Sequence, residues 1–250
     1  MWSSLWAWLT DPANWQGTTG IPQRILEHLG YTGLSVLLAL VISLPIGAVI
    51  GHTGRGGVGV VGFANGLRAL PSLGVLTIVV LVWGLGLAPP IIALTILAIP
   101  PALAGTYAGI RAVDPAVVDA ARGVGMREWE VLLKVEVPNA MPLIFGGVRN
   151  ATLQVVATAT IAAYVALGGL GRFVIDGLAQ LNYSEMLGGA LLVAVLAIVL
   201  DLVLVGVQRL VVSRGLVESG VSRRRASRRR AANETVSDQP EPVHMGGNSA

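Results

Sequence analysis

The amino-acid sequence predicts an all-α integral membrane protein with five, and possibly six, transmembrane helices. Of its 250 residues, 54% are hydrophobic and only 12% are charged, whereas soluble proteins carry about 25% charged residues. Five apolar windows approach or exceed the length of about 20 residues that a helix needs to cross the hydrocarbon core. Most basic residues in the loops between these windows fall on one side of the membrane, as in polytopic membrane proteins.

The apolar windows define the predicted spans. They are residues 32–50, 57–87, 90–110, 143–167 and 187–208. The second window is interrupted at Pro71, and its length fits either one kinked span or a surface helix followed by a span. Six spans therefore stay an alternative to five.

The distribution of basic residues predicts the orientation of the chain. With five spans, one side carries Arg55, Arg111, Arg122, Arg127, Lys134, Arg149 and the arginine-rich tail. Only Arg24 and Arg172 fall on the other side. We therefore expect the N-terminus outside, and the loop 111–142 and the C-terminus in the cytoplasm. Arg68 lies inside the second window, where it could line a pathway or extend to the membrane interface, and we favour the interface.

The two ends of the chain are predicted to lie outside the transmembrane domain of residues 31–212. Residues 1–30 are expected to form an extracytoplasmic or interfacial segment, because tryptophans favour the headgroup region. This segment lacks the positively charged start of a cleaved signal peptide. Residues 213–250 form a basic tail that we expect to be disordered, with arginine clusters that anionic lipids would attract.

No side chains with the spacing of a catalytic or metal site can be recognised in the sequence. The three histidines are scattered, and there is no cysteine. The single lysine, Lys134, is followed by Val135, so the Walker A motif for phosphate binding is missing. Gly57–Gly62 match the dinucleotide-binding pattern GxGxxG in letters only, because no strand–helix unit surrounds them. We therefore expect neither an enzyme nor a bound cofactor or metal, and no nucleic-acid partner.

Three pairs of glycines predict close contacts between helices. They are Gly47 with Gly51, Gly62 with Gly66, and Gly105 with Gly109. Each pair has the GxxxG spacing that lets two helix backbones approach one another in a membrane, so we interpret all three as packing positions.

Four polar residues inside the spans are candidates for a role in transport. Asn150, Gln154 and Thr158 recur every four residues and share one face of the fourth span. Such side chains either bond across helices or line a water-filled path. Asp201, in the fifth span, is either a proton-coupling group or an acid near the cytoplasmic interface.

The loop between the third and fourth spans carries the strongest pattern. Asp114 and Pro115 are a helix start, and the helix is predicted to continue through Arg122. Gly123 and Gly125 would end it. A second amphipathic helix is predicted over 126–135 and is expected to stop before Pro138. A capped helix–turn–helix at the cytoplasmic side indicates a docking element.

This loop resembles the EAA loop of ABC-importer permeases, whose pattern is EAA-x3-G-x9-I-x-LP. Here Asp119, Ala120 and Ala121 stand for EAA, and Gly125 follows after three intervening residues. Nine further residues separate Gly125 from Val135–Pro138, which ends the pattern. The spacing is complete, and the departures are Asp for Glu and Val for Ile and Leu. The resemblance implies that Asp119, Ala120, Ala121, Gly125 and Pro138 belong to a coupling helix that inserts into a cytoplasmic ATPase.

The resemblance extends over residues 11–215 and is closest to permeases of the glycine betaine/carnitine/choline class. Supporting stretches are Asp11–Trp15, Gly20–Pro22, Glu27–Leu29, Gly51–Gly56, Leu70–Leu73, Tyr107–Ile110, Val113–Pro115 and Gly168–Gly171. It implies the type I ABC-importer (MetI-like) permease fold in a bacterial cytoplasmic (inner) membrane.

The resemblance also implies the partners of the chain. They are two copies of a cytoplasmic ATPase, a second permease subunit that is identical or homologous, and an extracytoplasmic binding protein that delivers the solute. ATP and Mg would then bind to the ATPase, and this chain would bind no cofactor. Because aromatic residues that could cage a quaternary ammonium are few, selectivity is expected to lie in the binding protein.

Two other functions are compatible with the sequence. A permease for another small solute, such as an amino acid, would carry the same loop. A secondary transporter that needs no ATPase could use Asp201 as its coupling group. A membrane-embedded enzyme is disfavoured because clusters of histidines or carboxylates are missing.

Overall fold

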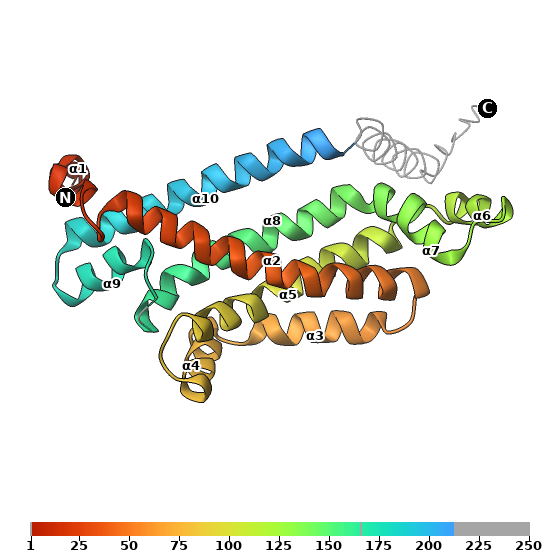
Figure 1. Ribbon diagram of the computed structural model, residues 1–250, viewed down its shortest axis with the longest axis horizontal. Helices are drawn as coiled ribbons and strands as arrows, with labels where there is room; N and C mark the ends of the chain where they lie inside the picture. Colours follow the sequence, from red (N-terminus) through yellow and green to blue (C-terminus); the bar gives the residue numbers. More distant parts are fainter. Residues whose placement is uncertain (1, 166, 213–250) are drawn as a thin grey trace, which may run out of the picture.

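The protein is a bundle of helices that run along one long axis (Figure 1). The computed structural model describes residues 2–165 and 167–212, and these contain no β-strand. Four long helices form the bundle: α2 (Ile21–Thr53), α5 (Ala88–Arg111), α8 (Val137–Ala162) and α10 (Tyr183–Val211). The all-α fold predicted from the sequence is confirmed. The predicted tail, residues 213–250, lies outside the described residues.

Shorter helices cover the two ends and one side of the bundle. They are α1 (Trp2–Thr10), η1 (Pro12–Trp15), α3 (Gly57–Ala69), α4 (Ser72–Trp83), α6 (Pro115–Gly123), α7 (Glu128–Val131), η2 (Leu132–Glu136), η3 (Ala163–Val165) and α9 (Gly171–Ala179). Figure 1 shows α1 and α9 at one end of the bundle and α6 and α7 at the opposite end.

The number of spans follows from helix length and composition. In the described part of the chain, four helices are long and apolar enough to cross a membrane. The pair α3 and α4 gives a fifth span if it crosses as one broken helix, bent by 89°. The interruption predicted at Pro71 is confirmed, since Pro71 lies between the two helices. Among the described residues there is no candidate for a sixth span.

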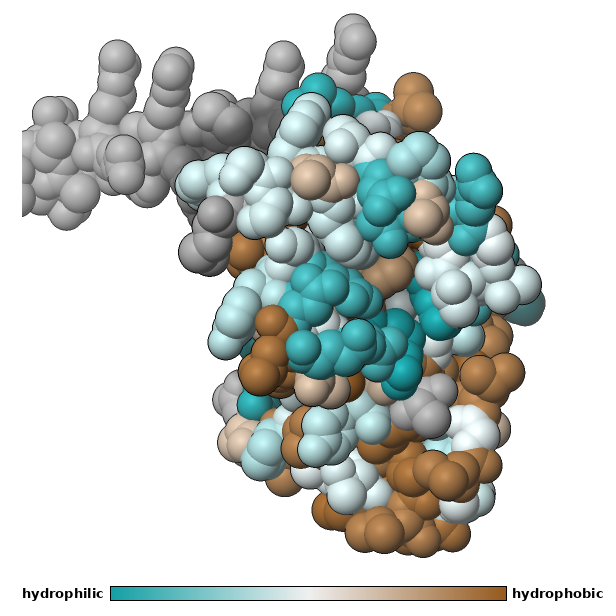
Figure 2. Space-filling model, turned by 90° about the vertical axis from the view of Figure 1, so that its left-hand side faces the viewer, coloured by the Kyte–Doolittle hydropathy of each residue, from teal (hydrophilic) through white to brown (hydrophobic). Residues whose placement is uncertain are grey.

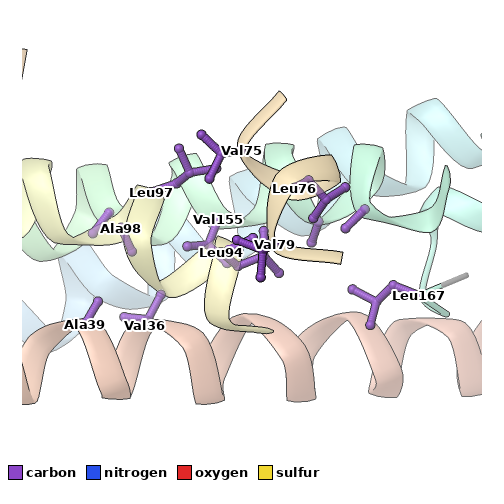
Figure 3. Close-up of a cluster of buried hydrophobic side chains, with 14 of the residues drawn as sticks. Val36, Ala39, Val75, Leu76, Val79, Leu94, Leu97, Ala98, Val155 and Leu167 are labelled. Atoms are coloured by element: carbon purple, nitrogen blue, oxygen red, sulfur yellow. The ribbon is translucent and has the colours of Figure 1, made fainter. Parts of the chain in front are cut away.

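The core of the bundle is formed by residues of α2, α4, α5 and α8. Its fully buried members include Ala39, Leu76, Leu94 and Val155, one from each of these helices. In Figure 3 these aliphatic side chains converge between the helices. The central helix is α5, with 56% of its apolar window buried, whereas α10 has only 6% buried and lies at the outside.

Glycines set the distances of α5 from its two neighbours. A Cβ on Gly105 would lie 2.5 Å from the Cα of Gly147 in α8, and a Cβ on Gly51 would lie 2.7 Å from Ile110 Cβ in α5. The predicted close packing is thus confirmed for the pairs at 47–51 and 105–109. It is wrong for Gly62 and Gly66, because a Cβ at either would have no neighbouring atom within 4 Å.

The prediction that Pro138 stops a helix is wrong. The helical segment runs without interruption from Glu128 to Val165. Proline lacks an N–H and its ring clashes with the carbonyl four residues earlier. A π-helical turn, Leu132–Glu136, lies directly before Val137 and Pro138, and the Val137 N–H donates to the Leu132 carbonyl. This wider turn allows the helix to continue through the proline.

The first span begins earlier than the apolar window suggests. Polar residues fill the first turns of α2, but three contacts hold them in the bundle. Arg24 donates to Glu27, and Glu27 accepts from the Gly169 N–H at 2.8 Å. His28 Nε2 lies 3.1 Å from the Val156 carbonyl of α8. Gly169 and Val156 lie more than 125 residues away in sequence, so hydropathy alone could not find this part of the helix.

We expect Gly105→Ala to lower the thermal stability of the purified protein. The added methyl must push α5 away from the α8 backbone, and overpacking of this kind costs about 1–3 kcal/mol. Gly146→Ala in α8 is the matched control, because a Cβ there meets no atom within 4 Å. That substitution should raise stability slightly, since alanine is the better helix former by about 1 kcal/mol. Thermal unfolding in detergent measures both, and equal midpoints would contradict the glycine contact.

Candidate coupling loop and polar cavity

Helix α6 begins at the cap predicted from the sequence. The Asp114 carboxylate accepts a hydrogen bond from the Ala116 N–H at 3.0 Å, and Pro115 occupies the first helical turn. An aspartate cap satisfies one of the N–H groups that the first turn leaves without a helical partner. The capped start fixes where α6 leaves the end of α5.

The end of α6 is a Schellman motif centred on Gly125. The Gly125 N–H donates to the Arg122 carbonyl at 2.9 Å, and the Met126 N–H donates to the Ala121 carbonyl at 3.2 Å. Gly125 has φ +87°, a left-handed conformation that costs a side chain about 1–2 kcal/mol. The glycine of the EAA pattern is therefore required by the turn itself.

The two arms of the loop pack on a small apolar core of their own. Val118, Ala121 and Val131 are buried in it, and Met126 packs against them. Asp119 and Ala120 point to the opposite, exposed face of α6. Two large apolar side chains are also exposed at this end, Val124 with 80% and Trp129 with 55% of their surface. The loop thus presents an ordered surface that no described residue covers.

A histidine connects this loop to the bundle. His52, in the last turn of α2, places Nδ1 2.6 Å from Glu136 and Nε2 3.1 Å from Glu128. Glu128 in turn accepts hydrogen bonds from the Arg122 guanidinium. These bonds raise the pKa of Arg122 above its usual value and keep it charged. This role of His52 is not visible in the sequence, because His52 and Glu136 are 84 residues apart and share no motif.

The predicted coupling residues have different environments. Asp119 is exposed and lies 3.6 Å from Arg122, and Ala120 is exposed beside it. Ala121 lies on the buried face of α6. Gly125 forms the turn, and Pro138 lies at the start of α8, exposed, beyond the π-helical turn. Four of the five thus form one helix–turn unit, and Pro138 stands apart from it.

A polar cavity of about 550 Å³ opens between the broken helix pair and the middle of the bundle. Four polar side chains line it: Arg68 of α3, Ser72 of α4, and Asn150 and Gln154 of α8. The other seven lining residues are leucines, prolines and an alanine. Of the predicted pathway residues, Asn150 and Gln154 share this cavity. Thr158 does not, because it is buried and its hydroxyl donates to the Gln154 carbonyl.

Asp201 is part of an ion pair between α10 and α8. Both of its carboxylate oxygens accept hydrogen bonds from Arg149, each at 2.9 Å. A bidentate guanidinium pair is among the strongest side-chain contacts. The charges of Arg149 and Asp201 thus form a link between the two spans α8 and α10. It therefore disfavours a proton-coupling role for Asp201.

The opposite end of the bundle also carries polar side chains. A cavity of about 220 Å³ there is lined in part by Arg24, Arg172, Asp176 and Glu185. Arg172 and Asp176 form an ion pair at 2.7 Å. Figure 2 shows this end of the molecule, with hydrophilic side chains gathered near its centre and hydrophobic ones beside them. Among residues 2–165 and 167–212, no three metal-ligating side chains form a cluster.

These features define a class of protein: a membrane-spanning helical bundle with a polar cavity between its spans and an ordered, exposed helix–turn–helix loop at one end. Residues 27–215 match the family described as binding-protein-dependent transport system inner membrane component. The chain therefore belongs to this family and is the permease subunit of an ABC importer, which works with an ATPase and a binding protein. It is a transport subunit and not an enzyme.

Characterised relatives cover most of the chain. The glycine betaine/carnitine/choline transport system permease protein of Bacillus subtilis is 35% identical over 73% of this chain and 84% of its own length. A carnitine transport permease protein of Listeria monocytogenes is 35% identical over 71% of this chain and 82% of its own. An osmoprotectant import permease protein of Salmonella typhimurium is 32% identical over 70% of this chain and 84% of its own length.

A solved structure confirms the fold. An inward-facing conformation of a methionine ABC transporter superposes with a TM-score of 0.71, covering 82% of this chain and 100% of that chain at 21% identity. The type I ABC-importer permease fold predicted from the sequence is thereby confirmed.

We expect His52 and Glu136 to stabilise the protein as a coupled pair. Removing His52 leaves the Glu136 carboxylate, only 5% exposed, without its partner among the described residues. A double-mutant cycle of His52→Ala and Glu136→Ala should therefore give a coupling energy of about 1–3 kcal/mol. The exposed pair of Lys134 and Glu130 is the control and should couple more weakly, because water screens it. Additive effects at His52 and Glu136 would show that the contact is not energetically significant.

We expect Asp201→Asn to lower stability without changing the pH profile of transport. The substitution weakens a charge-assisted hydrogen-bonded pair, a loss of about 1–3 kcal/mol. The exchanged pair Arg149→Asp with Asp201→Arg should recover part of the stability. Uptake measured at several pH values tests the alternative. If Asp201 were a proton-coupling acid, uptake by Asp201→Asn would no longer depend on pH.

Proposed function

We propose that this permease imports osmoprotectant-type solutes such as glycine betaine, carnitine, choline or proline betaine, delivered by an extracytoplasmic binding protein. The observation that supports the proposal is the identity of 31–35% with permeases named for these solutes, over most of both chains. ATP hydrolysis by two copies of the partner ATPase would drive the import. ATP and Mg would bind there, and this chain would need no cofactor.

The coupling loop is proposed to carry the movement of the ATPase to the spans. Asp119 and Ala120 lie on the exposed face of α6, where a partner can reach them. Gly125 forms the turn that ends α6, and the buried Ala121 packs α6 against the second arm of the loop, so that α6 is held in a fixed position. Helix α7 continues through η2 into α8 and carries Pro138 in this connection. His52 attaches the same loop to α2.

The orientation follows if the coupling loop lies in the cytoplasm. The N-terminus and the end with α1 and α9 would then face outside, where the binding protein docks. The C-terminal end of α10 points toward the same end as the coupling loop (Figure 1), so the C-terminus would be cytoplasmic. A second permease subunit, identical or homologous, would complete a pathway that opens to each side in turn, and Asn150 and Gln154 would line it.

An amino-acid permease is the second candidate. Solved structures of similar fold include the methionine transporter and an amino acid ABC transporter that covers 76% of this chain with a TM-score of 0.59. Because their identity to this chain is only 21%, they support the fold and not the solute. Import assays with methionine beside the betaines distinguish the two candidates.

The coupling proposal predicts that Gly125→Glu loses the ATPase. The substitution places a side chain at φ +87° and should reduce ATPase recovery about 5- to 30-fold, because that conformation costs about 1–2 kcal/mol and 1.4 kcal/mol is tenfold. Gly123→Ala is the matched control, since a Cβ there meets no atom within 4 Å and its φ is ordinary. The measurement is co-purification of the tagged chain from its native membrane in mild detergent, followed by mass spectrometry.

Two outcomes would contradict the proposed function. Full recovery of the ATPase with Gly125→Glu would show that α6 is not the docking element. Import of labelled solutes by proteoliposomes that hold this chain without an ATPase would favour a secondary transporter.

A further inference from the structure

The cavity beside the broken helix pair combines one cation with three neutral polar groups. Arg68 comes from the end of α3, Ser72 from the start of α4, and Asn150 and Gln154 from α8. Arg68, Asn150 and Gln154 are all exposed rather than packed. Guanidinium, amide and hydroxyl groups can all donate hydrogen bonds. The cavity is therefore equipped to receive an acceptor.

The cavity that Arg68 lines lies beside the middle of two spans. Pro100 and Pro101 line the same cavity and lie in the middle of α5. At 1.5 Å per residue, they are about 15–20 Å from either end of this helix. Asn150 lies equally near the middle of α8. These neighbours favour the pathway position for Arg68, the alternative that its place in the second window left open beside the interface.

The charge of Arg68 has no partner in the described structure. No acidic side chain is among the described residues that line the cavity, and none of the ion pairs within the described residues includes Arg68. The other arginine at mid-depth, Arg149, is paired with Asp201. An unpaired cation inside a membrane protein is costly and points to a ligand pathway. A guanidinium binds a carboxylate with two parallel hydrogen bonds.

We propose that this cavity receives the carboxylate end of a zwitterionic solute, paired with Arg68 and hydrogen-bonded by Asn150 and Gln154. The inference rests on the proposed function and specifies its substrate class: betaines and carnitine carry a carboxylate beside the quaternary ammonium, and choline carries none. No aromatic residue lines the cavity among the described residues, so an aromatic cage does not hold the ammonium end. The permease thus adds selection for an anionic end to the selectivity expected of the binding protein.

Direct binding tests the cavity without transport. In saturation-transfer difference NMR on the full-length permease in detergent, millimolar glycine betaine should receive saturation from the wild-type chain and from Arg68→Lys. Its signal should fall to background with Arg68→Gln. Choline at the same concentration should give a weaker signal that Arg68→Gln does not reduce. Arg55→Gln, which removes an exposed arginine outside the cavity, is the matched control and should bind like the wild type.

Transport by the complete importer tests the consequence. With the ATPase and binding protein present, Arg68→Gln should lower glycine betaine uptake at subsaturating concentration by about tenfold or more, as expected for the loss of a charge-assisted hydrogen-bond pair. Arg68→Lys should recover most of it, and Arg55→Gln should have no effect. Uptake of choline, where the wild type imports it, should not fall with Arg68→Gln.

The results separate the two proposals. Equal NMR signals for glycine betaine with the wild type and Arg68→Gln, or equal loss of both solutes in uptake, would overturn the carboxylate site. A wild-type chain that binds glycine betaine through Arg68 but imports none of the quaternary ammonium solutes with its partners would overturn the proposed function and leave the site standing.

Discussion

The close approach of α5 to its two neighbours is the contact on which the other parts of the structure depend. Glycines 47 and 51 of α2 face α5 on one side, and Gly105 of α5 faces Gly147 of α8 on the other. In a membrane, lipid is as apolar as the side chains, so helices associate through close packing rather than through the hydrophobic effect. With α5 held in the centre, α3 and α4 can be displaced to one side and leave a cavity beside them.

The ends of the bundle are held by a different kind of contact. At the coupling end, His52 links α2 to Glu128 and Glu136 of the loop. At the opposite end, Glu27 of α2 accepts from the Gly169 N–H, and Trp8 packs edge-on against Phe173 of α9. Polar contacts of this kind are directional and need specific partners. The middle of the bundle is thus held by close backbone packing and the Arg149–Asp201 pair, and its two ends by hydrogen bonds, ion pairs and one aromatic contact.

Sequence patterns predicted those features whose cause is local. The cap at Asp114, the turn at Gly125 and the break at Pro71 each depend on the backbone preferences of one or two residues. The continuation of the helix through Pro138 was not predictable, because the π-helical turn that permits it has no sequence pattern of its own. Contacts between distant residues were also missed: Arg149 with Asp201, and His52 with Glu136. In the candidate pathway, the shared face of Asn150 and Gln154 was predictable from their spacing, but Arg68 joins them only through the fold.

The uninterrupted helix from Glu128 to Val165 has a mechanical consequence. It is 38 residues long, about 57 Å at 1.5 Å per residue. Its backbone contact with the central helix α5, Gly147 against Gly105, lies almost at its midpoint. If this helix rotates as a rigid body about its central contact, its two ends move in opposite directions. A 5° tilt would displace the loop end by about 2.5 Å and the far end by the same amount in the opposite direction. If a partner pushes the loop end, such a tilt would move the far end of the helix in the opposite direction.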